Sequence, residues 1–357
     1  MALTLWLYKS PIFKTNPSKV GISQITFNDQ IRHRILPIKL WYPVSHNSKI
    51  TPLHCGIWKC QNVAQDTPIA TVKSQYPLIL FSHGYGGSGL DSSWFAQFLA
   101  SHGFIVVTVD HYGNTFYNML AQSSIAPFER ARDITFVLDQ LLEHPEWSTH
   151  IDSNNIGIAG FSQGGATALW LAGAQTKFTD IEKEGGPIIG LDEKKELPNT
   201  FDDRDQFDEI LIHFNIDQAN ESFKDTRIKA VFAMAPGLGG KKNYFTSESL
   251  QHIKIPIYII AGALDSVNPI LENAQFFAKH IKNAQLTILP HATHWIFLNE
   301  GNELGKKTKP LLTIDNESID RTQLHEIIGN IALNFFENVL NKKRKELSHH
   351  LQEYFPS

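Results

Sequence analysis

A serine set between glycines is the residue of this chain that is best placed to act as a nucleophile. Ser162 is the centre of the sequence GFSQG at 160–164, which follows the apolar run 155–159 and precedes the helix-like run 165–171. This order of strand, tight turn and helix exposes the serine hydroxyl, and flanking glycines permit close backbone packing and strained dihedral angles. The following helix directs its N-terminal N–H groups and positive dipole end at the serine. These features predict acyl transfer.

Two residues later in the chain could complete such a site. A serine hydroxyl is a poor nucleophile at neutral pH, so it needs an imidazole to accept its proton and a carboxylate to orient that imidazole. Asp265 follows the apolar run 255–261, and His294 follows the run 285–289. The chain order Ser162, Asp265, His294 is expected when the serine sits on a strand-to-helix turn. We predict these three as the catalytic residues.

The assignments of the base and the acid each have an alternative. His291 follows the same strand as His294. We prefer His294, because Trp295 and the apolar residues behind it could pack and hold a loop histidine, as a positioned base requires. We also expect Trp295 to contact the substrate. The alternative for Asp265 is a loop-capping aspartate, since such caps are common after strands.

Backbone donors for a developing oxyanion are predicted in two places. One donor is the N–H of Gln163, directly after the serine. The other is the N–H of Tyr85, in the loop SHGYGG at 82–87, where glycines allow close approach of the backbone. A plain glycine turn is the alternative interpretation of this loop.

A histidine and two carboxylates elsewhere are weaker candidates. His111 ends an apolar strand candidate, and we expect it to line the substrate pocket, although histidines in such loops more often have no catalytic role. Asp110 and Asp133 could serve as alternative acids, but both precede Ser162 and fit the expected chain order poorly.

The elements that must position these residues alternate between continuous apolar runs and amphipathic helices. Such runs are typical of parallel strands that are covered on both faces. Residues 20–27 and 34–42 alternate apolar and polar positions instead, which predicts an antiparallel pair at a sheet edge. The fold class is therefore α/β, with a mostly parallel, doubly wound sheet and an antiparallel N-terminal strand pair. The expected parallel strands are 77–81, 104–109, 155–159, 228–234, 255–261 and 285–289, and the expected helices are 93–102, 127–144 and 165–171.

The chain of 357 residues is long enough for one large domain with its own core. We expect a single domain over 1–357, interrupted at 173–226 by a charged segment with few apolar residues. We interpret that segment as a cap or lid over the active-site rim, or alternatively as a solvated surface excursion. A C-terminal helix is expected from about residue 322 onward.

The charge distribution argues against a nucleic-acid partner. Lys and Arg number 32 and Asp and Glu 36, for a net charge of −4, and the charges are interspersed. The basic cluster KKRK at 342–345 is interpreted as a solvated helix face rather than a membrane patch. The chain contains no run of 18 or more apolar residues, so no spanning helix is expected. The apolar N-terminus is not interpreted as a signal peptide, which makes the cytoplasm the default location and leaves a secreted or periplasmic one open if the true start lies upstream.

The two cysteines, Cys55 and Cys60, leave two interpretations open. With His54 they are too few for a closed zinc site, so no metal is expected. A disulfide in an oxidising compartment and two free thiols in a reducing one are equally compatible with the sequence.

Together these motifs resemble a known group of enzymes. From about Val20 to Phe336, the chain resembles the serine-dependent branch of the dienelactone hydrolase-like α/β-hydrolases and, more loosely, the plasma-type platelet-activating-factor acetylhydrolases. The resemblance rests on LWYP at 40–43, FSHGYGG at 81–87, VDHYG at 109–113, RDI at 132–134, VLDQL at 137–141, GFSQGG at 160–165, GALD at 262–265 and HWIFL at 294–298.

The resemblance implies an α/β-hydrolase fold with a partial cap insertion and an esterase that needs no metal or organic cofactor. Dienelactone hydrolases proper use a cysteine at the turn, so Ser162 argues against true dienelactone chemistry. Plasma-type acetylhydrolases carry their acid after the strand that follows the nucleophile strand, where this chain has MAPG at 234–237. The acid is therefore expected one strand later, at Asp265.

The expected substrate is a small-molecule carboxylic ester with a short acyl chain, cleaved through an acyl-enzyme. Short-acyl phospholipids and polyester oligomers are alternative substrates. An acyltransferase, or a catalytically silent scaffold that binds a ligand or a partner, is the alternative function. No oligomeric state is predicted.

Overall fold

One sheet of nine strands forms the centre of this computed structural model, which describes residues 17–120, 123, 126–177, 215–239 and 244–340. From one edge to the other, the strands are β11 (Ala284–Leu289), β10 (Ile257–Gly262), β9 (Ile228–Met234), β8 (Ile151–Phe161), β4 (Tyr76–Ser82), β5 (Ile105–Val109), β2 (Arg34–Val44), β1 (Lys19–Asp29) and β3 (Ala64–Gln65). The strands from β11 to β5 pair in parallel, whereas β2 is antiparallel to both β5 and β1. The predicted fold class is confirmed.

The N-terminal strand pair lies close to one edge, and only the two-residue β3 pairs beyond β1. β2 itself is internal, although it contains Pro37, which lacks a backbone N–H. Pro37 is tolerated because its carbonyl accepts the N–H of Asp110, just past the end of β5, and the pairing with β5 begins only at Ile38. The missing donor would point toward Asp110, so the ladder loses one hydrogen bond at the end of the pairing with β5 and none in its interior.

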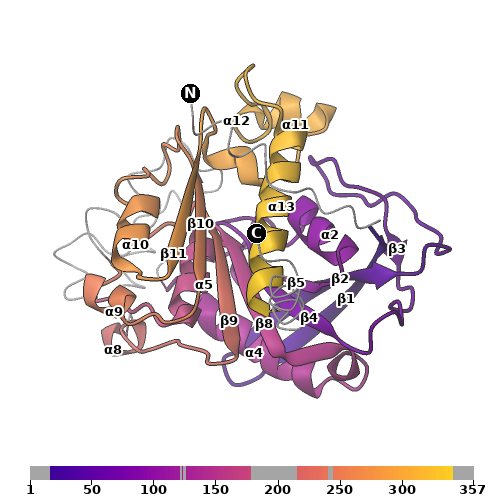
Figure 1. The fold of residues 1–357 in the computed structure, drawn as a ribbon, viewed down its shortest axis with the longest axis horizontal. Helices are drawn as coiled ribbons and strands as arrows, with labels where there is room; N and C mark the ends of the chain where they lie inside the picture. The colour runs from indigo at the N-terminus through magenta and orange to yellow at the C-terminus, as the bar shows by residue number, and fades with distance from the viewer. Residues whose placement is uncertain (1–16, 121–122, 124–125, 178–214, 240–243, 341–357) are drawn as a thin grey trace, which may run out of the picture.

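Helices cover both faces of the sheet (Figure 1). On one face lie α2 and α13, and on the other lie α4, α5 and α10. Side chains along β4 alternate between the two cores: Leu78 and Leu80 pack under α4 and α5, whereas Ile79 and Phe81 pack under α2 and α13. The helices are α2 (Ser93–Ser101), α4 (Glu129–Glu143), α5 (Gln163–Ala172), α8 (Ile216–Ala219), α9 (Ser247–Gln251), α10 (Ala274–His280), α11 (Glu303–Thr308), α12 (Pro310–Thr313) and α13 (Arg321–Leu340), with short 3-10 turns η1 (Trp147–Thr149) and η2 (His294–Phe297).

Most of the expected cap lies outside the described residues, which omit 178–214. Its two ends are described and pack together on the body of the fold. Thr176 forms a β-bridge with Phe245, and its hydroxyl donates a hydrogen bond of 2.8 Å to the carbonyl of Ala219 at the end of α8. The basic cluster at 342–345 also lies outside the described residues.

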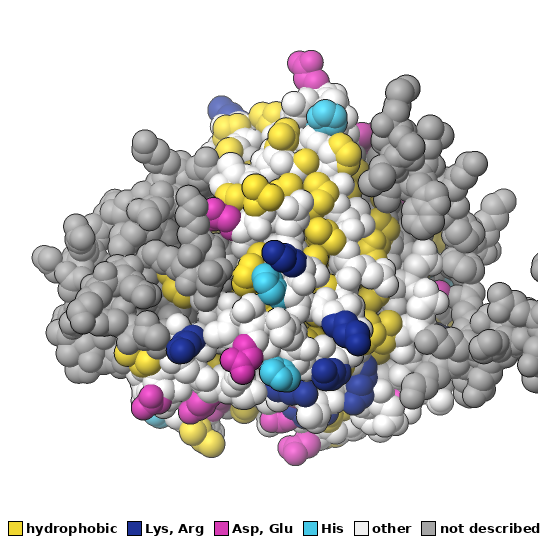
Figure 2. Space-filling model, turned by 60° about the vertical axis from the view of Figure 1, so that its left-hand side comes forward, with side chains coloured by type: hydrophobic (Ala, Val, Ile, Leu, Met, Phe, Trp, Pro, Cys, Tyr) yellow, Lys and Arg dark blue, Asp and Glu magenta, His cyan; other side chains and the backbone are white. Residues whose placement is uncertain are grey.

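The molecular surface carries mixed charge. On the face shown in Figure 2, Lys and Arg side chains occur alongside Asp and Glu side chains and hydrophobic ones. None of the helices in the described ranges is both long enough and apolar enough to cross a membrane. Within the same ranges, no three His, Cys, Asp or Glu side chains cluster in a way that could hold a metal ion.

The parallel strands deliver the predicted residues to one end of the sheet. β4, β5, β8, β10 and β11 are followed by the loop 82–87, the loop 110–113, Ser162, Asp265 and His294. Because the carboxyl ends of parallel strands lie at the same sheet edge, these segments converge although they are far apart in the sequence.

Candidate active site

Ser162 occupies a strained turn between β8 and α5. Its dihedral angles are φ 56° and ψ −117°, in a region that residues other than glycine rarely adopt. Four backbone hydrogen bonds hold it there: its N–H donates to the Met234 carbonyl, and its carbonyl accepts from Gly165, Ala166 and Gly237. The surrounding structure therefore fixes the backbone of Ser162 in this conformation.

The flanking glycines are required by close backbone contacts. A Cβ on Gly160 would overlap the carbonyl oxygen of Gly164, and a Cβ on Gly164 would overlap that of Ser82. Neither neighbour is a flexible side chain that could move aside. The motif is therefore glycine-rich because two backbone segments pack directly against the turn.

Asp265 and His294 form a buried hydrogen-bonded pair. The Nδ1 atom of His294 lies 2.8 Å from Oδ2 of Asp265. The other carboxylate oxygen accepts the backbone N–H groups of Val267, at 3.0 Å, and Asn268, at 2.7 Å. These contacts fix the carboxylate, which in turn holds the imidazole with its proton on Nδ1 and leaves Nε2 to accept a proton.

Two contacts connect this pair to the serine turn. Asn268 donates from Nδ2 to the carbonyl of Ala235 at 2.9 Å, and the same atom lies 3.5 Å from Oγ of Ser162. The rings of His294 and Phe161, the residue before the serine, have centroids 4.8 Å apart. Asn268 was not among the residues predicted from the sequence. Its position three residues after Asp265 is the one sequence feature that could have pointed to it.

The rival histidine is placed differently. His291 is exposed and has a left-handed φ of 61°, as a residue at a loop turn has. The imidazole that pairs with Asp265 is that of His294. Trp295 is buried, 8% exposed, and its ring stands perpendicular to that of His294 at a centroid distance of 5.0 Å. The tryptophan therefore packs beside the histidine.

The loop 82–87 lies against the serine turn. A Cβ built on Gly84 would be 3.6 Å from Cβ of Ser162. The loop is fixed on either side of Tyr85, because Gly86 N–H donates to Asn114 and Gly87 N–H donates to the Gly84 carbonyl. Gln163, at the start of α5, follows the serine directly. Both residues predicted to donate N–H groups thus belong to segments that border Ser162.

His83 anchors this loop from below in its neutral form. Burial, together with the charge of Arg130, lowers the pKa of His83 well below its usual range. Its Nε2 accepts the backbone N–H of His111 at 3.2 Å, so the single proton must be on Nδ1. From there it donates to the carbonyl of Gly84 at 2.7 Å.

His111, expected to line the substrate pocket, is instead completely buried. Its Nδ1 lies 3.0 Å from Oδ2 of Asp133, and its Nε2 lies 2.9 Å from Oγ of Ser82. Burial and the charge of Arg130 lower its pKa to about 4, although Asp133 acts in the opposite direction. Both ring nitrogens bond inside the protein, so neither is left to contact a substrate.

Asp133 is the centre of the buried ionic cluster beneath this loop. Arg34 donates to it from Nε at 2.7 Å and from Nη2 at 2.9 Å, and Arg32 donates from Nη1 at 3.0 Å. Burial alone would raise the pKa of Asp133, but Arg34 and His111 outweigh that effect and lower it. This carboxylate is therefore an ionised partner of buried cations and lies apart from the Asp265–His294 pair.

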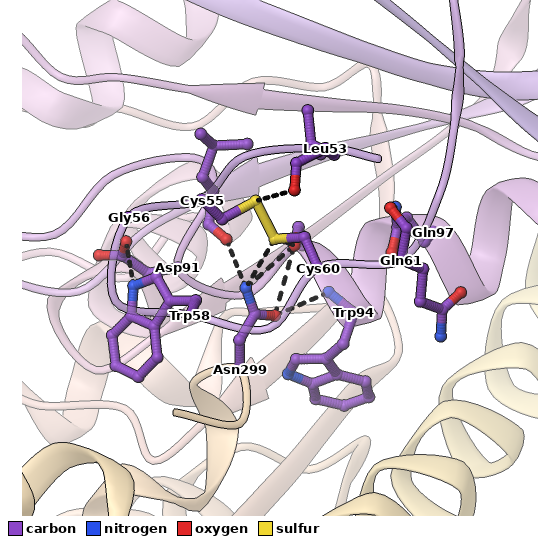
Figure 3. The surroundings of a disulfide bond; sticks show 12 residues. Leu53, Cys55, Gly56, Trp58, Cys60, Gln61, Asp91, Trp94, Gln97 and Asn299 are labelled. Atoms are coloured by element: carbon purple, nitrogen blue, oxygen red, sulfur yellow. Dashed lines mark hydrogen bonds between the residues drawn. A yellow bond between two sulfur atoms is a disulfide. The ribbon is translucent and has the colours of Figure 1, made fainter. Parts of the chain in front are cut away.

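A disulfide between Cys55 and Cys60 lies against the segment that follows His294 (Figure 3). Asn299 links the two: its Nδ2 lies 3.6 Å from Sγ of Cys60 and donates to the carbonyl of Leu90 at 2.8 Å. The Oγ of Ser93 lies 3.3 Å from the same sulfur. The sequence left the disulfide and the free thiols equally open, and the structure contains the disulfide.

The loop closed by this disulfide forms further bonds to the same segment. Lys59 N–H donates to the carbonyl of Glu300, and the Lys59 ammonium lies 2.7 Å from the Glu300 carboxylate. Asn302 N–H donates to the carbonyl of Ile57. Trp58 donates from its indole nitrogen to Asp91 at 3.0 Å. The loop therefore supports the chain just after the histidine.

Comparison with known proteins finds relatives among esterases. Cutinase 2 of Thermobifida cellulosilytica is 32% identical over 99 residues, which cover 27% of this chain and 34% of that protein. Cutinase cut1 of Thermobifida fusca is 32% identical over 99 residues, which cover 27% of this chain and 28% of that protein. This chain thus spans about a third of the length of these curated relatives.

A likeness over nearly the whole chain identifies the fold. The solved structure of a ferulic acid esterase from Streptomyces cinnamoneus matches with a TM-score of 0.61 and 17% identity, over 94% of this chain and 93% of that one. At this identity the likeness shows the fold alone, which is the α/β-hydrolase fold expected from the sequence. A family model described as chlorophyllase matches residues 60–355. Because that match covers well over half of the residues, this chain belongs to the chlorophyllase family.

Proposed function

We propose that this protein is a serine hydrolase that cleaves carboxylic esters. The observation that carries the proposal is the 2.8 Å hydrogen bond between His294 and Asp265, on loops that meet the strained turn of Ser162. That arrangement activates a serine hydroxyl for attack on a carbonyl carbon. Family membership and the cutinase relatives support the same reaction class.

In the proposed mechanism, Oγ of Ser162 attacks the ester carbonyl while Nε2 of His294 takes the hydroxyl proton. The Asp265 carboxylate holds the Nδ1–H and stabilises the imidazolium that forms. His294 then gives the proton to the departing alkoxide, which leaves as an alcohol. A water molecule attacks the acyl-enzyme with His294 again as the base, releasing the carboxylic acid and restoring Ser162.

The tetrahedral intermediates need donors for the negative oxygen. The backbone N–H groups of Tyr85 and Gln163 are proposed for this role, because both belong to segments packed against the serine turn. Gln163 is also the first residue of α5, so its N–H lies at the positive end of the helix dipole.

The substrates that we propose are small esters with short acyl chains, as in the serine-dependent dienelactone hydrolase-like branch, with short-acyl phospholipids or polyester oligomers as alternatives. Trp295 supplies an apolar wall beside His294. A second apolar surface is the hairpin of β6 (Asn114–Thr115) and β7 (Asn118–Met119), whose turn exposes Phe116 by 60% and Tyr117 by 55%. Cε of Met119 on this hairpin approaches Gly86 of the loop 82–87, which brings the hairpin to the site.

The test is covalent labelling of the purified protein by a fluorophosphonate probe, with hydrolysis of p-nitrophenyl esters of graded chain length. We expect the parent protein to be labelled, the Ser162→Ala variant not to be labelled, and acetate or butyrate esters to react fastest. Labelling that persists in Ser162→Ala, or an unlabelled parent, would contradict the proposed function. Product analysis with competing alcohols separates a hydrolase from an acyltransferase.

A further inference from the structure

We propose that Arg130 is a positioning residue that holds both halves of the oxyanion site, so that one buried guanidinium sets the spacing of the two backbone donors. This inference rests on the proposed function and deepens it. It assigns to α4, a helix that carries none of the predicted catalytic residues, a direct part in the geometry of the reaction.

Arg130 bridges the two segments that carry the donors. It lies in the first turn of α4 and is 1% exposed. Its Nη1 donates to Oε1 of Gln163 at 2.9 Å, and its Nη2 donates to the carbonyl of His83. Gln163 follows the nucleophile, and His83 begins the loop of Tyr85. A single rigid, planar group therefore ties the serine turn to the loop 82–87.

Arg130 acts on the Tyr85 donor indirectly, because it holds the backbone of His83, and the His83 imidazole in turn holds the Gly84 carbonyl. Because His83 carries its proton on Nδ1 and donates it to the Gly84 carbonyl, the bond that Arg130 makes to this residue is the one to its carbonyl. The Gly84 carbonyl and the Tyr85 N–H belong to the same planar peptide group and point in opposite directions. Holding that carbonyl against the buried histidine therefore turns the Tyr85 N–H away from it.

The contact to Gln163 acts on the other donor. Its side-chain oxygen faces Arg130, and within the described residues its buried Nε2 has no hydrogen-bond partner. The Gln163 side chain therefore keeps its bond to the guanidinium, although this orientation leaves its own amide nitrogen without a hydrogen bond. The backbone N–H of Gln163, at the start of α5, is the second proposed donor. The bond between the Gln163 side chain and Arg130 therefore restrains the position of that N–H.

The charged guanidinium of Arg130 donates its hydrogen bonds to neutral acceptors. Its hydrogen bonds in the described part of the chain go to an amide oxygen and a backbone carbonyl, whereas the carboxylate of Asp133 is bonded by Arg34. Burial lowers the pKa of Arg130 to about 9, and Asp133 opposes this effect. A buried cation without a directly bonded anion is costly to the folded state, but it stabilises negative charge that develops nearby.

The experiment compares Arg130→Lys and Arg130→Met with Arg34→Lys. Arg34 is a matched control, because it is also a buried arginine of the same cluster, but it bonds to Asp133 and Tyr112 rather than to the two donor segments. For each variant, kcat and KM with p-nitrophenyl acetate, the inhibition constant of an alkyl boronic acid, and Tm are measured.

We expect both Arg130 variants to lose roughly 10- to 100-fold in kcat with KM changed by less than about threefold, because a lysine nitrogen cannot reach both acceptors. Boronic acid affinity should fall in proportion to kcat/KM, since the tetrahedral adduct uses the same donors. Arg34→Lys should lower Tm while kcat stays within about threefold of the parent, because lysine can still pair with Asp133.

A further variant keeps the test decisive if Arg130→Met does not fold. Gln163→Met removes the acceptor of Arg130 but keeps the backbone N–H, so its loss in kcat should be strongly non-additive with that of Arg130→Lys. Additive losses, or Arg130 variants whose kcat and boronic acid affinity match those of Arg34→Lys, would overturn the inference. A parent that fluorophosphonate does not label would instead contradict the proposed function itself.

Discussion

The loop that carries Tyr85 and the segment that carries His294 are held in place by different kinds of interaction. Beneath Tyr85, Arg130 and the neutral His83 hold the loop directly, and a deeper buried cluster of Arg34, Asp133 and His111 lies under Ser82. Beside His294 lies a disulfide-closed loop with backbone and amide hydrogen bonds. Charge and proton position thus support one side, and covalent and backbone constraints support the other.

The difference follows from what each side does in the proposed reaction. Donors that stabilise a developing charge must be oriented before the charge appears, and the buried Arg130 and His83 fix the orientation of these donors. The base instead must stay near the serine while its protonation changes, so a support that is insensitive to charge suits it. We therefore expect low pH to destabilise the side that carries Tyr85, and reducing agents to destabilise the side that carries His294.

The largest expected effect is the loss of the acid that orients the base. Asp265→Asn should reduce kcat by about 10⁴-fold, because an amide stabilises the wrong tautomer of His294. Steady-state kinetics measure this loss, and Asp225→Asn, which breaks an ion pair with Arg227 elsewhere, is the control. A loss of less than tenfold would mean that Asp265 does not orient the base.

The ionic side should depend on Asp133 for stability. Asp133→Asn leaves buried arginines without their anion, so we expect a loss of about 3–5 kcal/mol in the free energy of unfolding. Urea denaturation measures it. Asp139→Asn is the matched control on the same helix, because its ion pair with Arg227 is half exposed and contributes at most about 1 kcal/mol. Equal losses of unfolding free energy in the two variants would mean that the buried cluster contributes no more to stability than the half-exposed ion pair.

Acid should destabilise the ionic side in a defined range of pH. The pKa of His111 is lowered to about 4 by burial, so between pH 6.5 and pH 4 the unfolded chain binds a proton that the folded chain does not. Stability is therefore full above pH 6.5 and falls on acidification by about 1.4 kcal/mol per pH unit for each such histidine. His83, whose pKa is lowered in the same way, adds to this slope.

The other side should contribute little to this slope, since two of its groups oppose each other. His325 lies in α13, with its Nε2 2.8 Å from the carbonyl of Ile296. Burial lowers the pKa of His325 to about 3 and raises that of Asp91 to about 6. Acidification therefore costs stability through the histidine and restores it through the carboxyl group.

Urea denaturation at several pH values tests the effect of acid on the Tyr85 side. His111→Gln should reduce the slope of stability against pH by about one proton, and an unchanged slope would contradict the assignment.

The smallest expected effect is that of the disulfide. A Cys55→Ser, Cys60→Ser double variant should lose about 2 kcal/mol in unfolding free energy, because the closed loop is short. With the support of Asn299 loosened, kcat should fall by less than about tenfold. Dithiothreitol should reproduce both effects in the parent and leave the double variant unchanged. An effect of dithiothreitol on the double variant would mean that the sensitivity to reductant does not come from this disulfide.

The sheet could be predicted from the sequence because its signals are local. Continuous apolar runs of five to seven residues correspond to β4, β5, β9 and β10, with ends that differ by at most two residues. The pairing of Asp265 with His294 was expected from their places after two such strands, and the structure shows that hydrogen bond. Their catalytic roles, with those of Ser162, Tyr85 and Gln163, stay predictions.

The features that sequence analysis missed depend on contacts between distant segments. Neither the burial of His111 nor the bond from Arg130 to Gln163 leaves a local pattern, because each joins residues more than 20 positions apart. Asp133 was considered only as an alternative acid, whereas its arginine partners come from β2 and the preceding turn, about 100 residues earlier. Burial and pairing of polar groups are properties of tertiary packing, which periodicity does not report.

The bond between Lys59 and Glu300 spans 241 positions of the chain, with a consequence for biosynthesis. As the polypeptide leaves the ribosome, the cysteine loop emerges well before the segment around Glu300 and meets its counterpart only after that segment has been made. A nascent chain that already contains Ser162 still lacks the anchored segment of His294. The proposed active site is therefore assembled only after residue 300 has left the ribosome.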